Sequence, residues 1–92
     1  MITIFKYPLQ IGSLTTVTFS AGPDQDVPDL LHVGMQGDQV MLWAKVEKYG
    51  QWSVTRKFQV VGTGWAVHPS WKYFGTVHDS HGFVWHVFED LS

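Results

Sequence analysis

Short runs of β-branched and aromatic residues recur along the whole chain, separated by Gly, Pro, Asp and Ser. No stretch keeps the 3.6-residue apolar period of an amphipathic helix, whereas alternation with a period of two is common. This pattern restricts the chain to an all-β fold. It predicts seven strands, at Ile2–Leu9, Leu14–Ser20, Leu31–Gln36, Gln39–Glu47, Trp52–Val61, Tyr73–Asp79 and Phe83–Glu89.

The segments between these runs predict how the strands connect. Gly37-Asp38, Tyr49-Gly50 and Asp79-Ser80-His81-Gly82 are tight-turn signals, and Gly22–Asp29 is a polar loop that could hold a short turn of helix. Tight turns join antiparallel strands, because parallel pairing needs crossovers of a dozen or more residues. We therefore expect a small antiparallel meander of about six or seven strands that forms a twisted sheet, a sandwich or a partly open barrel.

Alternation also predicts which faces are buried. In Gln39–Glu47 one face is entirely apolar and Trp43 lies on the opposite, wetter face. Phe83–Phe88 is apolar on both faces, which is typical of a central strand or of an edge covered by another subunit. The buried face of Gln39–Glu47 is expected to consist of Val40, Leu42, Ala44 and Val46.

The aromatic content exceeds what a small core can hold. The 92 residues make one β domain, residues 1–92, and 15% of them are Phe, Trp or Tyr. Some of these rings must line a groove, a pocket or a subunit interface, so we expect a homo-oligomer. Trp65, Trp71 and Trp43 are the candidates, because exposed rings stack on nucleobases or sugars or anchor a protein interface. Trp52 and Trp85 are expected to fill the core.

Charge and composition exclude several classes of function. The net charge of −2 argues against non-specific nucleic-acid binding, which needs a basic surface. No apolar run approaches the roughly 18 residues of a membrane span, and the N-terminus lacks the features of a signal peptide. The absence of Cys excludes disulfides and cysteine-ligated metals and fits a reducing cytoplasm. We expect no cofactor.

The five His residues do not predict a metal site. If Asp79–Gly82 forms the last turn, His78 pairs with Phe83 and Gly75 with His86, so the two His point to opposite faces. His86 would then have room above its ring and could donate to a ligand oxygen or to a backbone carbonyl.

Gly62-Thr63-Gly64 could present backbone N–H groups to an anion, but it lacks the remainder of a phosphate loop, and a structural turn is the favoured interpretation. Arg56 and Lys57 lie just upstream. Arg56 interrupts an apolar face, so it is either a rim charge or a ligand for a phosphate or carboxylate.

Catalytic patterns are missing. The chain has no Gly-x-Ser-x-Gly elbow and no Cys nucleophile, and most of its carboxylates fall in turns and tails. We expect no catalytic residues and no enzyme activity.

Several segments resemble a family of small phage and prophage proteins known as a domain of unknown function. They are Ile4–Leu9, Leu42–Ala44, Arg56–Phe58, Val61–Gly64, Gly75-Thr76 and Phe83–Glu89. The closing Phe-Val-Trp-His-Val-Phe-Glu and the Gly-Thr-Gly are the most specific of these. Members often carry His after Gly-Thr-Gly, where this chain has Trp65, and the Gly22–Asp29 segment is longer here.

The resemblance implies a phage accessory protein in the host bacterial cytoplasm. By class analogy, such proteins inhibit host defence, some by sequestering nucleotide-derived immune signals at oligomer interfaces. The expected function is therefore non-catalytic sequestration of a cyclic-nucleotide or ADP-ribose type signal. Trp residues would stack on the base, Arg56, Lys57 and the glycine amides would hold phosphate, and His86 or Thr63 would contact sugar. The candidate ligand-binding residues are Trp43, Arg56, Lys57, Thr63, Gly64, Trp65, Trp71 and His86.

Two alternatives stay open. The chain could be a protein-interaction module that inhibits a host defence effector directly or forms a minor virion component, which predicts a flat aromatic patch. It could also hydrolyse a nucleotide signal, which needs a carboxylate or His cluster that the sequence does not reveal.

Overall fold

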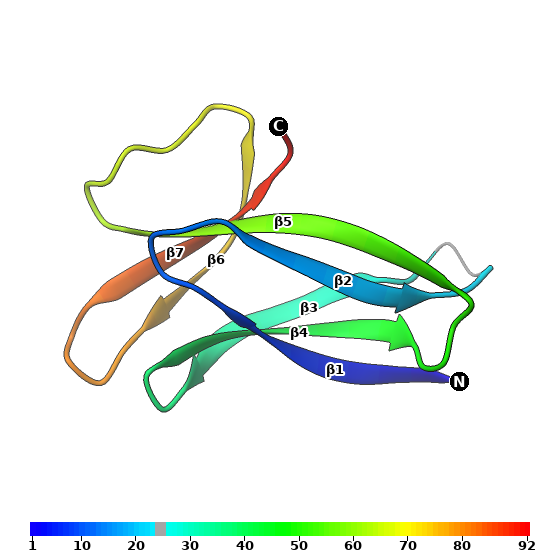
Figure 1. Ribbon diagram of the computed structural model, residues 1–92. Coiled ribbons are helices and arrows are strands. Elements are labelled where there is room, and N and C mark those ends of the chain that lie inside the picture. Colours follow the sequence, from blue (N-terminus) through cyan, green and yellow to red (C-terminus); the bar gives the residue numbers. More distant parts are fainter. Residues whose placement is uncertain (24–25) are drawn as a thin grey trace.

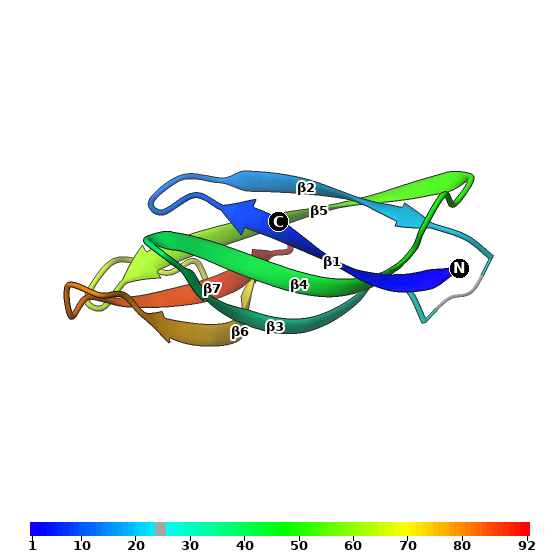
Figure 2. The same cartoon turned by 90° about the horizontal axis from the view of Figure 1, so that it is seen from below.

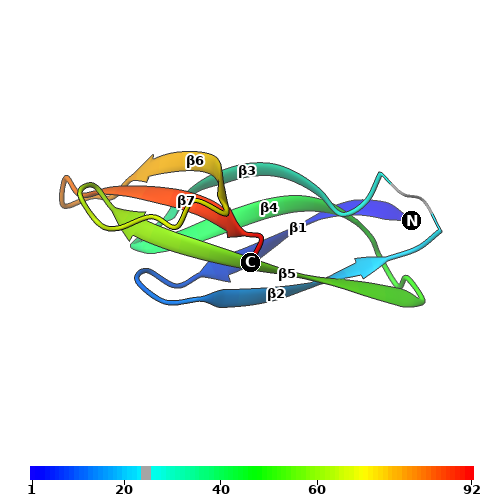
Figure 3. The same cartoon turned by 90° about the horizontal axis from the view of Figure 1, so that it is seen from above.

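Seven antiparallel strands form two sheets that pack face to face in the computed structural model, which describes residues 1–23 and 26–92 (Figure 1). The strands are β1 (Ile2–Leu9), β2 (Thr15–Ala21), β3 (Asp29–Gln36), β4 (Gln39–Glu47), β5 (Trp52–Gly62), β6 (Trp71–His78) and β7 (Val84–Asp90). A three-stranded sheet in the order β1-β4-β3 covers a four-stranded sheet in the order β2-β5-β7-β6. The expected all-β antiparallel fold is thus confirmed in its sandwich form. Figure 1 shows one layer above the other, and Figures 2 and 3 look onto the sheets from below and from above.

Only two connections join strands that are neighbours in both sequence and sheet. The Gly37-Asp38 turn closes the β3–β4 hairpin, and the segment after His78 closes the β6–β7 hairpin. The Tyr49-Gly50 turn instead leads from β4 into β5 of the other sheet, and β7 lies between β5 and β6. The meander therefore applies to the two hairpins alone, because the chain must pass repeatedly between layers to cover the apolar face of each.

Asp24 and Gln25, within the expected Gly22–Asp29 loop, lie outside the described residues. Among the residues that are described, no helix is long and apolar enough to cross a membrane.

The register of the last hairpin differs from the expected one by a residue. His78 pairs with Val84 and Thr76 with His86, because Asp79 pairs with Phe83 across a three-residue loop. In that loop Gly82 has φ +86°, the left-handed conformation that commonly closes three-residue hairpins. His78 and His86 therefore share a face, contrary to the prediction, and a Thr rather than a Gly stands opposite His86.

The core between the sheets is built on edge-to-face aromatic contacts. The Phe19 ring lies 4.9 Å from that of Tyr7 and 6.4 Å from that of Phe58, measured between centroids. The apolar face predicted for β4 is buried in this core, and β7 is a central strand, one of the two alternatives expected for Phe83–Phe88. Trp52 is 56% exposed beside the β4–β5 turn, so the prediction that it fills the core is wrong. The largest fully buried side chains are Phe19, Phe58, Leu9, Leu42, Val40, Val46, Val60 and Val87.

Gly50 lets the β4–β5 turn touch the end of β2. A Cβ atom at Gly50 would lie 2.1 Å from the carbonyl oxygen of Ala21, which belongs to a strand and cannot give way as a side chain could. The Gly50 amide also donates to the Ser20 hydroxyl at 3.0 Å and to the Glu47 carbonyl at 3.1 Å. This contact fixes how β4 crosses into the other sheet.

We predict that Gly50→Ala lowers the free energy of unfolding by about 3 kcal/mol or more, because the added methyl overlaps backbone. Urea denaturation followed by circular dichroism measures the loss. Gln51→Ala, at the exposed neighbouring position, is the control and should change stability by less than about 0.5 kcal/mol. Equal stability of the Gly50→Ala and Gln51→Ala variants would contradict this account of the turn.

Candidate functional site

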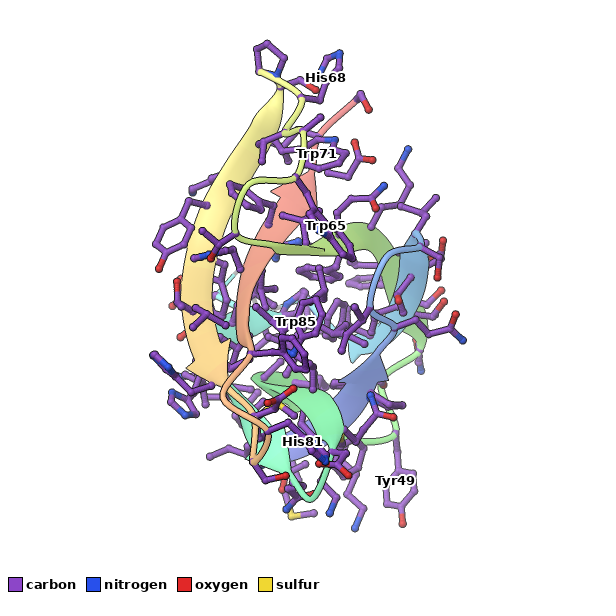
Figure 4. All side chains as sticks on the ribbon, turned by 90° about the vertical axis from the view of Figure 1, so that its left-hand side faces the viewer. Tyr49, Trp65, His68, Trp71, His81 and Trp85 are labelled. Carbon is purple, nitrogen blue, oxygen red and sulfur yellow. The ribbon has the colours of Figure 1, made fainter. Side chains whose placement is uncertain are left out.

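An open groove of about 440 Å³ lies at the end of the sandwich where the β5–β6 connection meets the β6–β7 hairpin. Figure 4 looks at this end and shows Trp65 on the connection above Trp85 of β7. The β1–β2 turn borders the same place, because a Cβ atom at Gly12 would lie 3.6 Å from Cζ3 of the Trp65 ring. The groove is lined by Gly62, Thr63, Trp65, Gly82, Phe83, Val84 and Trp85.

A tight turn at the end of β5 brings Trp65 into the groove. The Trp65 amide donates to the carbonyl of Gly62 at 3.1 Å, and Gly64, the third residue of the turn, has φ +90°. This is the glycine position of a type II turn. A Cβ at Gly62 would lie 3.1 Å from Trp65 Nε1 and 3.3 Å from Trp85 Cζ3. Gly62-Thr63-Gly64 thus forms a structural turn whose glycines let two indoles lie close to the backbone.

The other wall of the groove is held by the carboxylate of Asp79. It accepts hydrogen bonds from the indole N–H of Trp85 at 3.0 Å and from the amides of His81 and Phe83, each at 2.9 Å. The Trp85 ring then stands edge-to-face against Trp65, with centroids 5.7 Å apart, and lies 6.0 Å from the Phe83 ring. One carboxylate therefore closes the hairpin and orients an aromatic wall.

These contacts change the acidity of Asp79. Desolvation raises its pKa, but the hydrogen bonds from Trp85, Phe83 and His81 outweigh desolvation and leave the pKa below its ordinary value of 3.8. Asp79 is therefore ionised at neutral pH and carries a negative charge at the edge of the Trp85 ring.

A chain of four hydrogen-bonding side chains runs across the outer face of the four-stranded sheet. Thr63 Oγ1 lies 2.8 Å from His86 Nε2, His86 Nδ1 lies 3.1 Å from Thr76 Oγ1, and that oxygen lies 2.6 Å from the Tyr73 hydroxyl. His86 does not line the groove. It holds Thr63, which does, so His86 acts on the groove through the Thr63 hydroxyl.

The remaining predicted residues lie elsewhere. Arg56 is six residues before Gly62 on β5, roughly 20 Å away at strand spacing. Lys57 faces the outer side near the C-terminus, where its Nζ donates to the Ser92 carbonyl at 2.7 Å. Trp43 lies on the outer face of the other sheet against His32, with ring centroids 5.8 Å apart. The structure thus brings together Thr63, Gly64 and Trp65, with His86 behind them, but neither basic residue.

Trp71 belongs to a second aromatic group on the outer face of the four-stranded sheet. Its ring lies 6.1 Å from that of Phe88, which in turn lies 5.7 Å from the Tyr73 ring. His68 joins the group from the β5–β6 connection, 6.5 Å from Trp71, and Figure 4 shows both beyond Trp65. Trp71 pairs with Asp90, five residues along β7 from Trp85, so it lies away from the groove and does not line it.

Arg56 binds a carboxylate that belongs to the chain itself. Its Nε and a terminal nitrogen donate to the two oxygens of Glu89 at 2.6 and 2.5 Å, a bidentate pair at the end of the core. Glu89 is the one buried charged residue of the described chain. The hydrogen bond to Glu89 raises the pKa of Arg56 against the opposing effect of desolvation. Arg56 is a structural partner and its fork is not free for phosphate.

Sequence reasoning missed Asp79, Phe83 and Trp85 as site residues. The available signal was Asp79 at the start of a short turn that contains Gly82. Two aromatic residues, Phe83 and Trp85, follow this turn directly. An Asp in a turn commonly caps backbone amides, and this one does so while its second oxygen binds the indole.

Within residues 1–23 and 26–92, no group of three or more His, Asp or Glu side chains is placed to hold a metal ion. His78 and His86 share a face, but a third ligand is not beside them in that part of the chain.

Comparison with known proteins gives a single match. The model of a family described as a domain of unknown function (DUF7352) matches residues 1–92. No curated protein and no solved structure matches the chain. The expected membership in a domain of unknown function is thereby confirmed, and the match carries no activity with it.

We predict that Glu89→Gln lowers the free energy of unfolding by about 2 kcal/mol, because it leaves the half-buried Arg56 guanidinium without its anionic partner. Chemical denaturation of the purified variant measures this loss. Lys45→Met, which removes the exposed Lys45–Asp29 pair at 4.0 Å, is the matched control and should cost less than about 0.5 kcal/mol. If the two variants lose the same stability, the Arg56–Glu89 pair does not anchor this end of the core.

The pKa of Asp79 gives a pH dependence of stability. Because the folded-state pKa lies below 3.8, the contribution of Asp79 is fully present above that pH and is lost as the pH falls toward the folded-state pKa. Asp90, whose pKa is lowered by hydrogen bonds from Ser92, acts in the same direction. We expect the melting temperature of the wild-type protein to decrease when the pH is lowered below about 4. The melting temperature of the Asp79→Asn variant should decrease less steeply over the same pH range. Circular-dichroism melts measure both melting temperatures as a function of pH. If they decrease in parallel for wild type and variant, the ionised Asp79 carboxylate does not contribute to the stability of the fold.

Proposed function

Because the chain belongs to the family of this domain of unknown function (DUF7352), which assigns no activity, we propose its role from the site: it is a non-catalytic binding protein. It sequesters a nucleotide-derived signal of the cyclic-nucleotide or ADP-ribose type in the groove at Trp65. In this proposal the protein is a phage accessory factor that acts against host defence in the bacterial cytoplasm.

The observation that carries the proposal is the half-exposed indole of Trp65, 49% accessible, in an open groove beside a hydroxyl. Exposed indoles on a fixed backbone are stacking platforms for bases, worth about 1–3 kcal/mol per base. The Thr63 hydroxyl, held by His86, supplies a polar contact for the sugar or for the edge of the base. Ligand pockets commonly combine apolar walls with a few such fixed polar groups.

The phosphate part of a ligand would be bound differently from the sequence expectation. Arg56 is tied to Glu89, and Lys57 faces another part of the surface. In this proposal the groove therefore holds the base and sugar, and the phosphates extend into solvent. Recognition would depend on stacking more than on charge, and affinity would change little with salt concentration.

We propose a binding protein rather than an enzyme because of the groups that surround His86. A hydroxyl nucleophile activated by His requires a third group that stabilises the imidazolium, usually a carboxylate. Thr63 does contact His86, but the far ring nitrogen of His86 meets the Thr76 hydroxyl rather than an acid. The four side chains therefore form a hydrogen-bonded brace behind the groove.

A second candidate function is a protein-interaction module, and the outer aromatic group of Trp71, Tyr73 and Phe88 favours it. Tyr73 is 57% exposed on β6, an edge strand, and the three rings make a row on the sheet surface. Aromatic rows of this kind anchor partner proteins or a second copy of the same chain. The partner would be a host defence effector, a virion component or another protomer.

Binding is tested by titrating the protein with cyclic di-AMP, cyclic GMP-AMP and ADP-ribose and following tryptophan fluorescence and thermal stability. We expect Trp65→Ala to weaken the affinity roughly tenfold to a hundredfold, because it removes the stacking surface. Trp43→Ala, the same change on the other sheet, is the matched control and should leave affinity unaltered.

The outcomes separate the two candidates. No response from any of the three probes would overturn sequestration of this class of signal. Retention of a bacterial protein by wild type, lost in Tyr73→Ala but kept in Trp65→Ala, would favour the interaction module.

A further inference from the structure

The walls of the groove are rich in π electrons and carry no positive charge. Trp65, Trp85 and Phe83 supply three rings, and the centroid of the Trp85 ring lies 5.7 Å from that of Trp65 and 6.0 Å from that of Phe83. None of the seven lining residues, all within the described part of the chain, is Lys, Arg or His. The face of an aromatic ring is electronegative and attracts cations, most strongly in Trp.

Two carboxylates lie at this end of the sandwich, and one of them bonds directly to the Trp85 indole. Asp79 accepts the Trp85 indole N–H at 3.0 Å, and a donor bonded to an anion passes electron density into its ring. Asp38, at the tip of the β3–β4 hairpin, accepts a hydrogen bond from Ser80 at 3.0 Å and lies 3.9 Å from the His81 ring. Both carboxylates belong to the end of the sandwich that holds the groove.

The basic side chains that could offset these charges are engaged elsewhere. Arg56 is paired with Glu89 in the middle of β5, six residues before Gly62, and Lys6 donates to Gln36 at 2.8 Å on the outer side of the other sheet. The groove therefore presents an electronegative aromatic surface to its ligand.

We propose that the groove selects a nucleotide whose stacked ring carries a formal positive charge, either an N-methylated purine or a pyridinium ring such as nicotinamide. This inference rests on the proposed function and adds the electronic class of the ring. A cationic ring gains the same stacking area as a neutral one and adds a cation–π attraction to Trp65 and Trp85. The phosphates of such a nucleotide remain outside the groove, away from Asp79.

The test compares matched pairs that differ in ring charge. Affinities for 7-methylguanosine monophosphate against guanosine monophosphate, and for NAD⁺ against NADH, are measured by titration calorimetry. We expect the charged member of at least one pair to bind about fivefold to thirtyfold more tightly, from the strength of a desolvated cation–π contact. Which pair shows the preference identifies a purine or a pyridinium ligand.

A conservative variant isolates the electrostatic part. Trp65→Phe keeps a flat ring but has a weaker electronegative face, so the ratio of the affinities for the charged and the neutral member of a pair should fall toward one, whatever its effect on either affinity alone. Trp43→Phe is the control and should preserve the preference.

The possible failures are distinguishable. Equal affinity for charged and neutral members in both pairs overturns the charge selection and leaves the proposed sequestration standing. No binding of any of the four nucleotides, nor of the three probes above, overturns the proposed function and this inference together. Binding of tetramethylammonium chloride without any nucleotide would show that the groove takes an aliphatic cation and would also overturn the inference.

Discussion

Face-to-face packing of two small sheets around Phe19 and Phe58 is the contact on which the rest of the molecule depends. Phe58 lies on β5 and Phe19 on β2 of the four-stranded sheet, and Phe19 also meets Tyr7 from the other layer. An apolar sheet face must be covered, and a chain of 92 residues can cover two only by packing them on one another. The ends of that sandwich are consequently all turns, and the groove is made of turn residues fixed at one of these ends.

The strand positions could be predicted from the sequence because most strands are half-buried and so alternate, and because Gly, Pro, Asp and Ser separate them. Ile2–Leu9 and Gln39–Glu47 were predicted with the bounds that the structure has, and the buried face of the second was predicted residue by residue. The pairing of strands could not be predicted in the same way. The contacts that decide between a meander and a sandwich join distant residues, and alternation does not record which neighbour a strand takes.

The candidate site was predicted in part, and the division has a physical cause. Thr63, Gly64 and Trp65 are adjacent in sequence, so their convergence is local and a glycine-containing turn is enough to indicate it. The role of Arg56 depended on Glu89, which lies 33 residues later and neutralises it. Asp79 was overlooked because a turn Asp that caps amides looks the same in sequence whether or not its second oxygen holds an indole. The shift of one residue in the β6–β7 register had the same origin, since the loop length is set by hydrogen bonds to Asp79.

The distribution of rings connects this fold to binding. Of the fourteen aromatic residues, six are exposed on the single chain: Phe5, Tyr49, Trp52, Trp65, Tyr73 and Phe83. Two of the six follow hydrogen-bonded backbone: Trp65 follows the turn at Gly62, and the Phe83 amide donates to the Asp79 carboxylate. The conformational entropy of these backbone positions is therefore lost during folding and not on ligand binding. A ring that is already fixed loses little conformational entropy when a flat ligand stacks on it. Tyr49, which is 85% exposed on its turn, contacts the Lys48 ammonium, 5.1 Å from its ring centroid, rather than a second ring. Preorganisation, more than exposure, is therefore what distinguishes the groove from the other aromatic surfaces of this molecule.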